Sequence, residues 1–237
     1  MKITGFIFAA GLGTRLYPLT ASRPKALVRH NGKTLLDSAL DKMFEAGIDH
    51  VIVNVHHFPD QIIDALRERP ERECICVSDE RAYLRDTAGG IKFAEHLWDD
   101  SELLLFYNVD ILSNIDLNKL IQSHIQTHSD ATLAVRHRKT QRYFLFQHDS
   151  GELCGWRNVK TGEEILTKEH LNADELAFSG IHVMNTALAR CIPSVEKASV
   201  TNFYLAQSTN RRISAYIHDE DSWCDVGKYD QFRNSLS

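Results

Sequence analysis

The chain has 237 residues, 43% of them apolar, with 27 basic against 32 acidic side chains and a formal net charge of −5. This size suits one substantial core, or one domain with an appended lobe. The acidic balance argues against a nucleic-acid partner, and no apolar run approaches the ~20 residues that span a bilayer. Five scattered cysteines favour reduced thiols and a cytoplasmic location, and the first apolar run lacks a cleavage site typical of a signal peptide.

Residues 1–137 alternate between strand and helix patterns. Short apolar or β-branched runs predict strands at 3–10, 51–55, 73–77, 102–110 and 131–136, and helical periodicity predicts helices at 35–48, 60–69, 88–98 and 117–128. This alternation is typical of an α/β, Rossmann-like doubly wound sheet with helices on both faces. Ligands bind such sheets at the carboxyl ends of the strands.

The pattern changes after residue 137. Runs at 142–147 and 152–157 flank Asp149-Ser150-Gly151, which predicts a hairpin. Further strands are predicted at 178–184 and 213–217, short helices at 186–192 and 200–209, and a final helix after 223–227. These elements indicate a second, mixed lobe that shares the core of the first.

The segment A-A-G-L-G-T-R-L-Y-P at residues 9–18 looks like a phosphate-binding loop but fits neither common form. G-x-G-x-x-G needs a third glycine where Leu16 stands, and no G-K-[ST] occurs. Glycines let backbone N–H groups approach a phosphate chain, and Arg15 and Lys25 add fixed positive charge. Taken alone, however, the segment fits a tight turn with surface cations somewhat better than a phosphate site.

Two aspartates are candidate ligands for a metal ion. Asp110 follows a buried apolar strand, and Asp225 stands in W-C-D-V-G at residues 223–227. If the fold brings them together, two hard oxygen donors plus substrate phosphates suit Mg²⁺. The alternatives are that Asp110 caps the next turn and that Asp225 caps the last helix.

Other motifs are weaker when taken singly. The small residues of D-T-A-G-G at 86–90 would let a base or sugar pack on the backbone, although an ordinary helix cap explains them as well. Ser179-Gly180 inside a strand marks a close approach to a ligand or only a bulge. The basic run Arg136–Arg142 is expected to be a solvated rim that could also contact an anionic substrate. His182 is expected to pack and not to react.

Together these motifs resemble the sugar-1-phosphate nucleotidyltransferases, the nucleoside-diphosphate-sugar pyrophosphorylases. The signature A-A-G-L-G-T-R-L-Y-P-L-T, followed by R-P-K-A-L, occupies residues 9–27. N-V-D at 108–110, F-S-G-I-H-V at 178–183 and W-C-D-V-G at 223–227 follow in the family's order. The chain is most similar to a short bacterial branch with N-acetylmuramate-1-phosphate uridylyltransferases and heptose- or mannose-1-phosphate guanylyltransferases. The resemblance implies a GT-A-like nucleotide-diphospho-sugar transferase fold with a small sugar-binding lobe.

The resemblance also implies roles for individual residues. One domain would span 1–237, with a nucleotide-binding half at 1–137 and a sugar-binding and metal-completing half at 138–237. Arg15 would neutralise the leaving pyrophosphate, and Lys25 would bridge the α-phosphate and the incoming sugar phosphate. The nucleotide contacts implied are Ala10, Gly11, Gly13, Thr14, Arg15, Asn54, Glu80, Thr87 and Gly89. The sugar contacts implied are Asn108, Ser179 and Gly180, and the Mg²⁺ ligands implied are Asp110 and Asp225.

The implied reaction transfers NMP from an NTP to a sugar 1-phosphate, with no nucleic acid or membrane partner and with a monomer or homodimer as the working form. UTP with an N-acetylmuramate 1-phosphate-like sugar is slightly favoured over a guanylyltransferase reaction on mannose or heptose 1-phosphate. One departure from the family pattern is Val109, which replaces the usual glycine before the metal aspartate and is expected to crowd the ribose.

Two other classes of protein are alternatives to this enzyme. A nucleotide-sugar sensor or regulatory subunit on the same fold usually has a broken loop or has lost a metal carboxylate. Here Arg15, Lys25, Asp110 and Asp225 are all present, which favours the enzyme. A dinucleotide-dependent oxidoreductase is disfavoured by the missing third glycine.

Overall fold

The computed structural model describes residues 1–169 and 172–234. Its main sheet contains β1 (Ile3–Phe8), β4 (Val51–Val55), β5 (Ile75–Asp79), β6 (Leu103–Asn108), β8 (Ala131–Arg136), β9 (Arg142–Gln147), β10 (Leu153–Asn158), β11 (Glu163–Leu166), β12 (Ala173–Asn185) and β13 (Ile213–Ile217). The strand order is β11-β10-β9-β12-β6-β1-β4-β5, and β8 pairs with both β12 and β13. Strands from both predicted halves of the chain therefore join one sheet.

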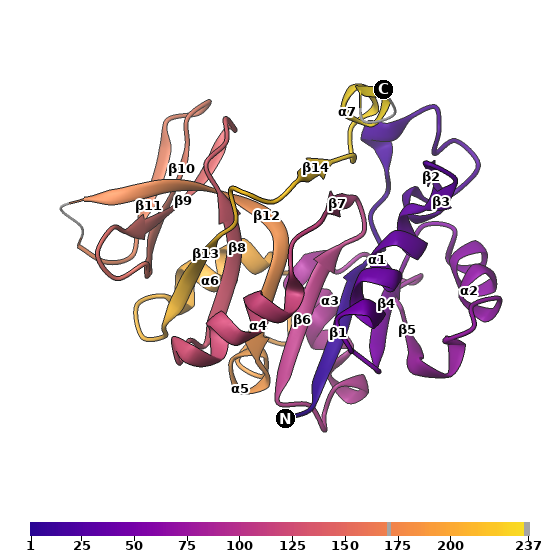
Figure 1. Ribbon diagram of the computed structural model, residues 1–237, viewed down its shortest axis with the longest axis horizontal. Helices are drawn as coiled ribbons and strands as arrows, with labels where there is room; N and C mark the ends of the chain where they lie inside the picture. The colour runs from indigo at the N-terminus through magenta and orange to yellow at the C-terminus, as the bar shows by residue number, and fades with distance from the viewer. Residues whose placement is uncertain (170–171, 235–237) are drawn as a thin grey trace.

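Helices cover both faces of this sheet (Figure 1). They are α1 (Leu35–Glu45), α2 (Pro59–Arg67), α3 (Asp86–Phe93), α4 (Leu117–Gln126), α5 (Thr186–Ala189), α6 (Val200–Gln207) and α7 (Tyr229–Asn234). Buried residues of α1, α2 and α4 belong to one hydrophobic cluster, and those of α3, α5 and α6 belong to a second. The doubly wound α/β fold predicted from the sequence is confirmed.

Two short strand pairs lie outside the main sheet. One joins β2 (Arg29–His30) to β3 (Lys33–Thr34), and the other joins β7 (Ile111–Ser113) to β14 (Trp223–Asp225). In Figure 1, β14 crosses above the main sheet on its way from β13 to α7. This crossing returns the end of the chain to the edge where the first strands end.

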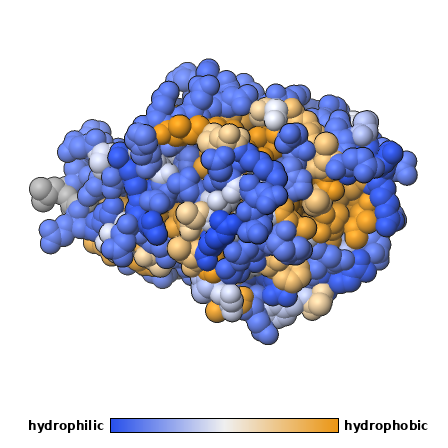
Figure 2. All heavy atoms as spheres, turned by 90° about the horizontal axis from the view of Figure 1, so that it is seen from below, coloured by the Kyte–Doolittle hydropathy of each residue, from blue (hydrophilic) through white to orange (hydrophobic). Residues whose placement is uncertain are grey.

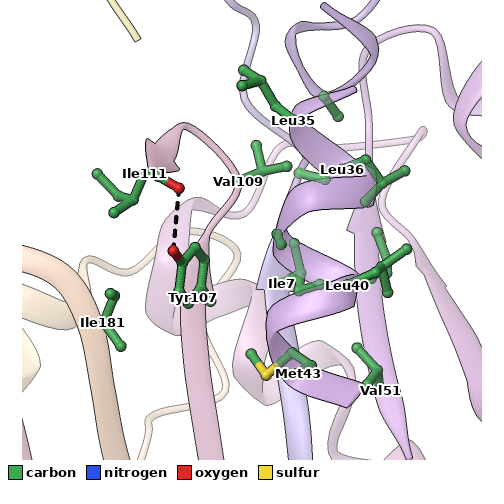
Figure 3. Close-up of a cluster of buried hydrophobic side chains, with 14 of the residues drawn as sticks. Ile7, Leu35, Leu36, Leu40, Met43, Val51, Tyr107, Val109, Ile111 and Ile181 are labelled. Atoms are coloured by element: carbon green, nitrogen blue, oxygen red, sulfur yellow. Dashed lines mark hydrogen bonds between the residues drawn. The ribbon is translucent and has the colours of Figure 1, made fainter. Parts of the chain in front are cut away.

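Helix α1 shows how sequence periodicity becomes packing. Leu35, Leu36, Leu40 and Met43 recur at helical spacing, and each side chain is at most 2% exposed. They pack over β1 and β4, as the close-up in Figure 3 shows. Burial of one such side chain contributes roughly 1.5–3 kcal/mol, so truncating Leu40 to alanine would cost about 2–5 kcal/mol.

Most predicted element boundaries shift by a few residues, and β12 begins five residues before the predicted strand at 178–184. Two of the shifts involve 3-10 turns. Strand β5 begins at Ile75 and not at residue 73, because Arg72–Cys74 form a 3-10 turn. Helix α3 ends at Phe93, and a separate 3-10 turn at Glu95–Leu97 replaces the end of the predicted helix. Both changes are at the ends of elements, where periodicity determines the boundary least.

Strand β11, in the second half of the chain, was not indicated by sequence periodicity. The hairpin predicted around Asp149-Ser150-Gly151 is confirmed, because β9 and β10 pair antiparallel across it. Beyond it, β11 pairs with β10 although all four of its residues are exposed. An edge strand without a buried face has no apolar alternation, so the pattern gave no signal.

Among the described residues, no helix is long and apolar enough to cross a membrane. Figure 2 views the molecule from the edge where β1 begins, and hydrophilic residues there surround several apolar areas. The carboxyl ends of the parallel strands lie at the opposite edge.

Candidate active site

Three strands end side by side at this edge. In the parallel register, Phe8 at the end of β1 lies between Asn54 of β4 and Asn108 of β6. The glycine loop follows β1 directly, and N-V-D follows β6. The carboxyl ends of neighbouring parallel strands thus bring the loop and the first candidate metal ligand together, as the fold class predicts.

Asn54 and Glu80 support the loop from beneath. Asn54 Oδ1 accepts hydrogen bonds from the backbone N–H groups of Ala9 at 2.8 Å and Ala10 at 3.3 Å. Its Nδ2 donates to Glu80 Oε1 at 2.7 Å. Glu80 is 1% exposed, and its other oxygen accepts the N–H of Arg85. Burial raises the pKa of Glu80, and the bond from Asn54 opposes that shift.

The two predicted catalytic cations both face Asp110. Lys25 Nζ lies 2.9 Å from Asp110 Oδ2, and Arg15 Nη2 lies 4.0 Å from the same atom. The Lys25 side chain is 13% exposed and that of Arg15 is 58% exposed. A Cβ added at Gly11 would lie 3.6 Å from Lys25 Nζ, so the loop backbone runs against the lysine. The arrangement concentrates positive charge beside a loop of backbone N–H groups.

Asp225 approaches Asp110 through the β7–β14 pair. Asp225 is paired with Ile111, and the N–H of Val226 donates to the carbonyl of Asp110 at 2.9 Å. A Cβ added at Gly227 would lie 2.2 Å from Asp110 Oδ2 and 2.9 Å from Asp225 Oδ1. Two carboxylate oxygens therefore converge on the space that glycine leaves free.

This donor set fits a hard divalent cation. Among residues 1–169 and 172–234, no cluster of three or more His, Cys, Asp or Glu side chains could hold a metal by itself. Mg²⁺ usually takes one or two carboxylates and completes its shell with water and substrate phosphates. Asp110 and Asp225 suit that pattern, and their assignment as metal ligands stays a prediction.

A cavity of about 320 Å³ opens above these strand ends. Nine of the predicted site residues line it: Ala10, Gly11, Arg15, Lys25, Asn54, Glu80, Thr87, Asn108 and Asp110. Phe8, Leu84 and Lys197 line it too, and sequence reasoning missed them. Lys197 lies in a segment without a recognisable motif, so only the fold reveals it. A larger hollow of about 780 Å³ beside His148 and Lys168 contains no predicted site residue.

The segment before α6 fixes the start of α3. Ala198 accepts the N–H groups of Ala88 at 2.9 Å and Gly89 at 3.1 Å, and Thr87 Oγ1 accepts the N–H of Val200 at 2.8 Å. Gly89 is therefore packed against this segment and does not line the cavity. Gly13 and Thr14 also lie outside the lining, because Gly13 adopts a left-handed conformation with φ of 66° and turns the chain into a 3-10 helix.

The predicted sugar contacts divide into two kinds. Asn108 lines the cavity, and its Nδ2 would lie 2.7 Å from a Cβ added at Gly180, whose φ is +77°. Ser179 is fully buried, and its Oγ is 2.7 Å from His218 Nε2. The Ser179 carbonyl accepts the indole N–H of Trp223 at 2.9 Å. Ser179 and Gly180 both lie within β12, where its pairing with β8 is irregular between Phe178 and His182, and the Ser179 side chain does not line the cavity.

Val109 does not meet the expectation that it crowds the ribose. The side chain is fully buried and belongs to the cluster under α1. Figure 3 shows it beside Leu36, with Tyr107 donating to the carbonyl of Ile111 at 3.2 Å on the other side of the turn. The chain therefore accommodates valine because the residue before Asp110 points into the core.

The chain belongs to the nucleotidyl transferase family, because the model of that family matches residues 4–236. It is 34% identical over 187 residues to an N-acetylmuramate alpha-1-phosphate uridylyltransferase of Caulobacter vibrioides, covering 75% of this chain and 73% of the relative. It is 25% identical to a putative mannose-1-phosphate guanyltransferase of Sulfolobus acidocaldarius, covering 95% of this chain and 60% of that relative. A mannose-1-phosphate guanyltransferase of Yarrowia lipolytica is 28% identical, with 96% of this chain and 61% of the relative covered.

Solved structures show the same fold. HddC from Yersinia pseudotuberculosis, complexed with GMP-PN, superposes with a TM-score of 0.77 at 20% identity, covering 98% of this chain and 97% of that one. A putative glucose-1-phosphate thymidylyltransferase from Bacillus anthracis gives a TM-score of 0.76 at 14% identity, with 99% and 94% covered. The predicted family and fold are confirmed, and the chain is an enzyme of the nucleotidyltransferase class.

Proposed function

We propose that this protein transfers a nucleotidyl group from an NTP to a sugar 1-phosphate and releases pyrophosphate. The observation that carries the proposal is the convergence of Arg15, Lys25 and Asp110 on one cavity, with Asp225 meeting Asp110 at Gly227. Fixed cations and hard carboxylates around a glycine loop suit phosphoryl chemistry, in which catalysis is mainly positioning and charge neutralisation.

The chemistry needs no general base. An oxygen of the sugar 1-phosphate, already an anion, forms a bond to the α-phosphorus of the NTP. The bond from that phosphorus to the bridging oxygen of the β-phosphate breaks, and pyrophosphate leaves with the electron pair. Arg15 neutralises the leaving charge, and Lys25 draws the two reacting phosphates together. Mg²⁺ bound by Asp110 and Asp225 would supply further charge neutralisation on the phosphates.

In this proposal the two halves of the chain have different roles. Residues 1–137 bind the nucleotide through the loop, which Asn54 and Glu80 support, and Thr87 lines the same cavity. Residues 138–237 contribute Gly180 to the sugar pocket and Asp225 to the metal site. Because an NTP is the donor, the cytoplasm is the compartment that suits this reaction, with either a monomer or a homodimer as the working form.

UTP with an N-acetylmuramate 1-phosphate-like sugar is the favoured pair, because the uridylyltransferase relative combines 34% identity with 73% coverage of its length. Mannose 1-phosphate with GTP is the second candidate, since the guanyltransferase relatives match 95% and 96% of this chain. The chain spans about 60% of the length of those two relatives.

A matrix of four NTPs against sugar 1-phosphates, read out as pyrophosphate release, tests the proposal. The expected result is release with one NTP and one sugar 1-phosphate well above that of Lys25→Ala. Release that does not require the sugar 1-phosphate, or that Lys25→Ala matches for every pair, would overturn the proposed reaction.

A further inference from the structure

Arg138 is a half-buried cation that the mechanism above does not use. It follows β8, and its guanidinium carbon lies 4.3 Å from the centre of the Trp223 ring. Nη2 donates to the carbonyl of Phe178 at 3.0 Å, whereas the buried Nε has no hydrogen-bond partner within the described part of the chain. Burial lowers the pKa of this guanidinium, and the charge of Asp225 opposes that shift.

The position of Arg138 joins two parts of the predicted site. Phe178, whose carbonyl it binds, directly precedes Ser179-Gly180 in β12, the pair proposed to lie beside the sugar. Trp223, on which it stacks, lies two residues before Asp225 in β14. Alternate residues of a strand face the same side about 7 Å apart, so the guanidinium and the Asp225 carboxylate lie on one side of β14.

In the proposed reaction, the acceptor sugar 1-phosphate would span the region between Gly180 and Asp225. In the proposed function its ring would lie beside Gly180, and its 1-phosphate would lie near the metal site of Asp110 and Asp225. Arg15 and Lys25 both lie against Asp110, next to the glycine loop that follows β1. The attacking phosphate approaches from the side opposite the leaving pyrophosphate, so a second cation away from that loop would share with Lys25 the charge of the attacking phosphate.

We propose that Arg138 binds the 1-phosphate of the acceptor sugar and positions it for attack. This inference rests on the proposed function and adds a residue that contacts the substrate. Stacking on Trp223 and the bond to Phe178 fix the plane of the guanidinium, which leaves its remaining donors in a set direction. A charge-assisted bond to phosphate also compensates for the partial burial of this cation, which forms no ion pair within 4.0 Å among residues 1–169 and 172–234.

The test compares Arg138→Gln and Arg138→Lys with Lys139→Gln, which removes the same charge from the neighbouring exposed residue. Calorimetry measures the affinity of each protein for N-acetylglucosamine 1-phosphate, for N-acetylmuramate 1-phosphate and for UTP and GTP. We expect Arg138→Gln to weaken both sugar 1-phosphates by about 10- to 100-fold and to leave nucleotide affinity within about twofold. Arg138→Lys restores part of the loss, and Lys139→Gln behaves like the wild type.

Two results would overturn the inference. Equal losses of nucleotide and sugar affinity would make Arg138 a structural residue. Loss for N-acetylmuramate 1-phosphate alone would mean that it reads the additional carboxylate of that sugar and not the 1-phosphate. Because binding is measured without turnover, these outcomes are separate from the pyrophosphate assay of the wild type, which decides the proposed reaction.

Discussion

Asn54 of β4 and Glu80, which follows β5, form a buried hydrogen bond of 2.7 Å, and Asn54 in turn binds the backbone at the start of the glycine loop. The Asn54 side-chain amide uses both of its polar atoms. Its oxygen accepts hydrogen bonds from the loop backbone, and its nitrogen donates to the Glu80 carboxylate. Both residues were predicted to contact the nucleotide directly. The structure gives them a supporting role in addition, since they hold Ala9 and Ala10 in position.

Replacing Asn54 with leucine should therefore loosen the loop. The change leaves the N–H groups of Ala9 and Ala10 and the Glu80 carboxylate without partners, which costs about 1–3 kcal/mol of unfolding free energy. We expect the KM for NTP to rise about tenfold, equivalent to about 1.4 kcal/mol. Thr4→Val is the matched control, because it removes a buried bond to Ser101 at the other end of β1. A similar rise in KM for both variants would contradict the supporting role.

Asp110→Asn and Asp225→Asn should each reduce turnover by about 100-fold or more, because each removes a charged ligand of the proposed metal. Mn²⁺ affinity, measured by titration in the presence of NTP, should fall in parallel. Asp64→Asn serves as the control, since it removes only an exposed ion pair with Arg67. Full turnover of the wild type in excess chelator would contradict the assignment of both aspartates as metal ligands.

Gly227→Ala probes the same site without changing its charge. The new Cβ would lie 2.2 Å from Asp110 Oδ2, so one carboxylate must move and metal affinity should fall. Gly151→Ala is the converse control, because its φ of +65° strains an alanine while nothing lies within 4 Å. We expect Gly151→Ala to lose about 1 kcal/mol of stability and to keep its activity. Normal Mn²⁺ affinity in Gly227→Ala would argue against the two-carboxylate site.

His182 predicts a pH dependence of stability. Its ring stacks on Phe106 with centroids 4.5 Å apart and meets Tyr204 edge-on, and neither ring nitrogen has a partner among the described residues. Burial lowers the pKa of His182 from 6.5 to about 3. The unfolded chain therefore binds more protons between these values, and the free energy of unfolding decreases as the pH falls from 6.5 towards 3.

His182→Leu should remove this dependence. At pH 5 the wild type is expected to have lost about 2 kcal/mol through this residue alone, whereas the leucine variant keeps that stability. Denaturant unfolding of both proteins at pH 5 and pH 8 measures the difference, since all other titrating groups are shared. An identical pH dependence in the two proteins would show that the ring is hydrated or partnered in solution.

Much of the architecture could be predicted from periodicity. Helix α1 is predicted because Leu36, Leu40 and Met43 recur on one face, and strand β4 is predicted because its residues form a β-branched run. Strand β11 could not be predicted, because its exposed residues take their conformation only from pairing with β10. His182 was expected to pack, and its burial among aromatic rings confirms this.

The sequence by itself determined the family, the alternation of strands and helices, and the identity of the loop with Arg15 and Lys25, because local pattern and spacing encode these features. Only the tertiary structure decided which distant residues meet. Asp225 reaches Asp110 through pairing of β14 with β7, Lys197 enters the cavity from an unmarked segment, and Arg138 stacks on Trp223. Such contacts join residues about 100 positions apart in several cases, and sequence spacing carries no information about them until the sheet has formed.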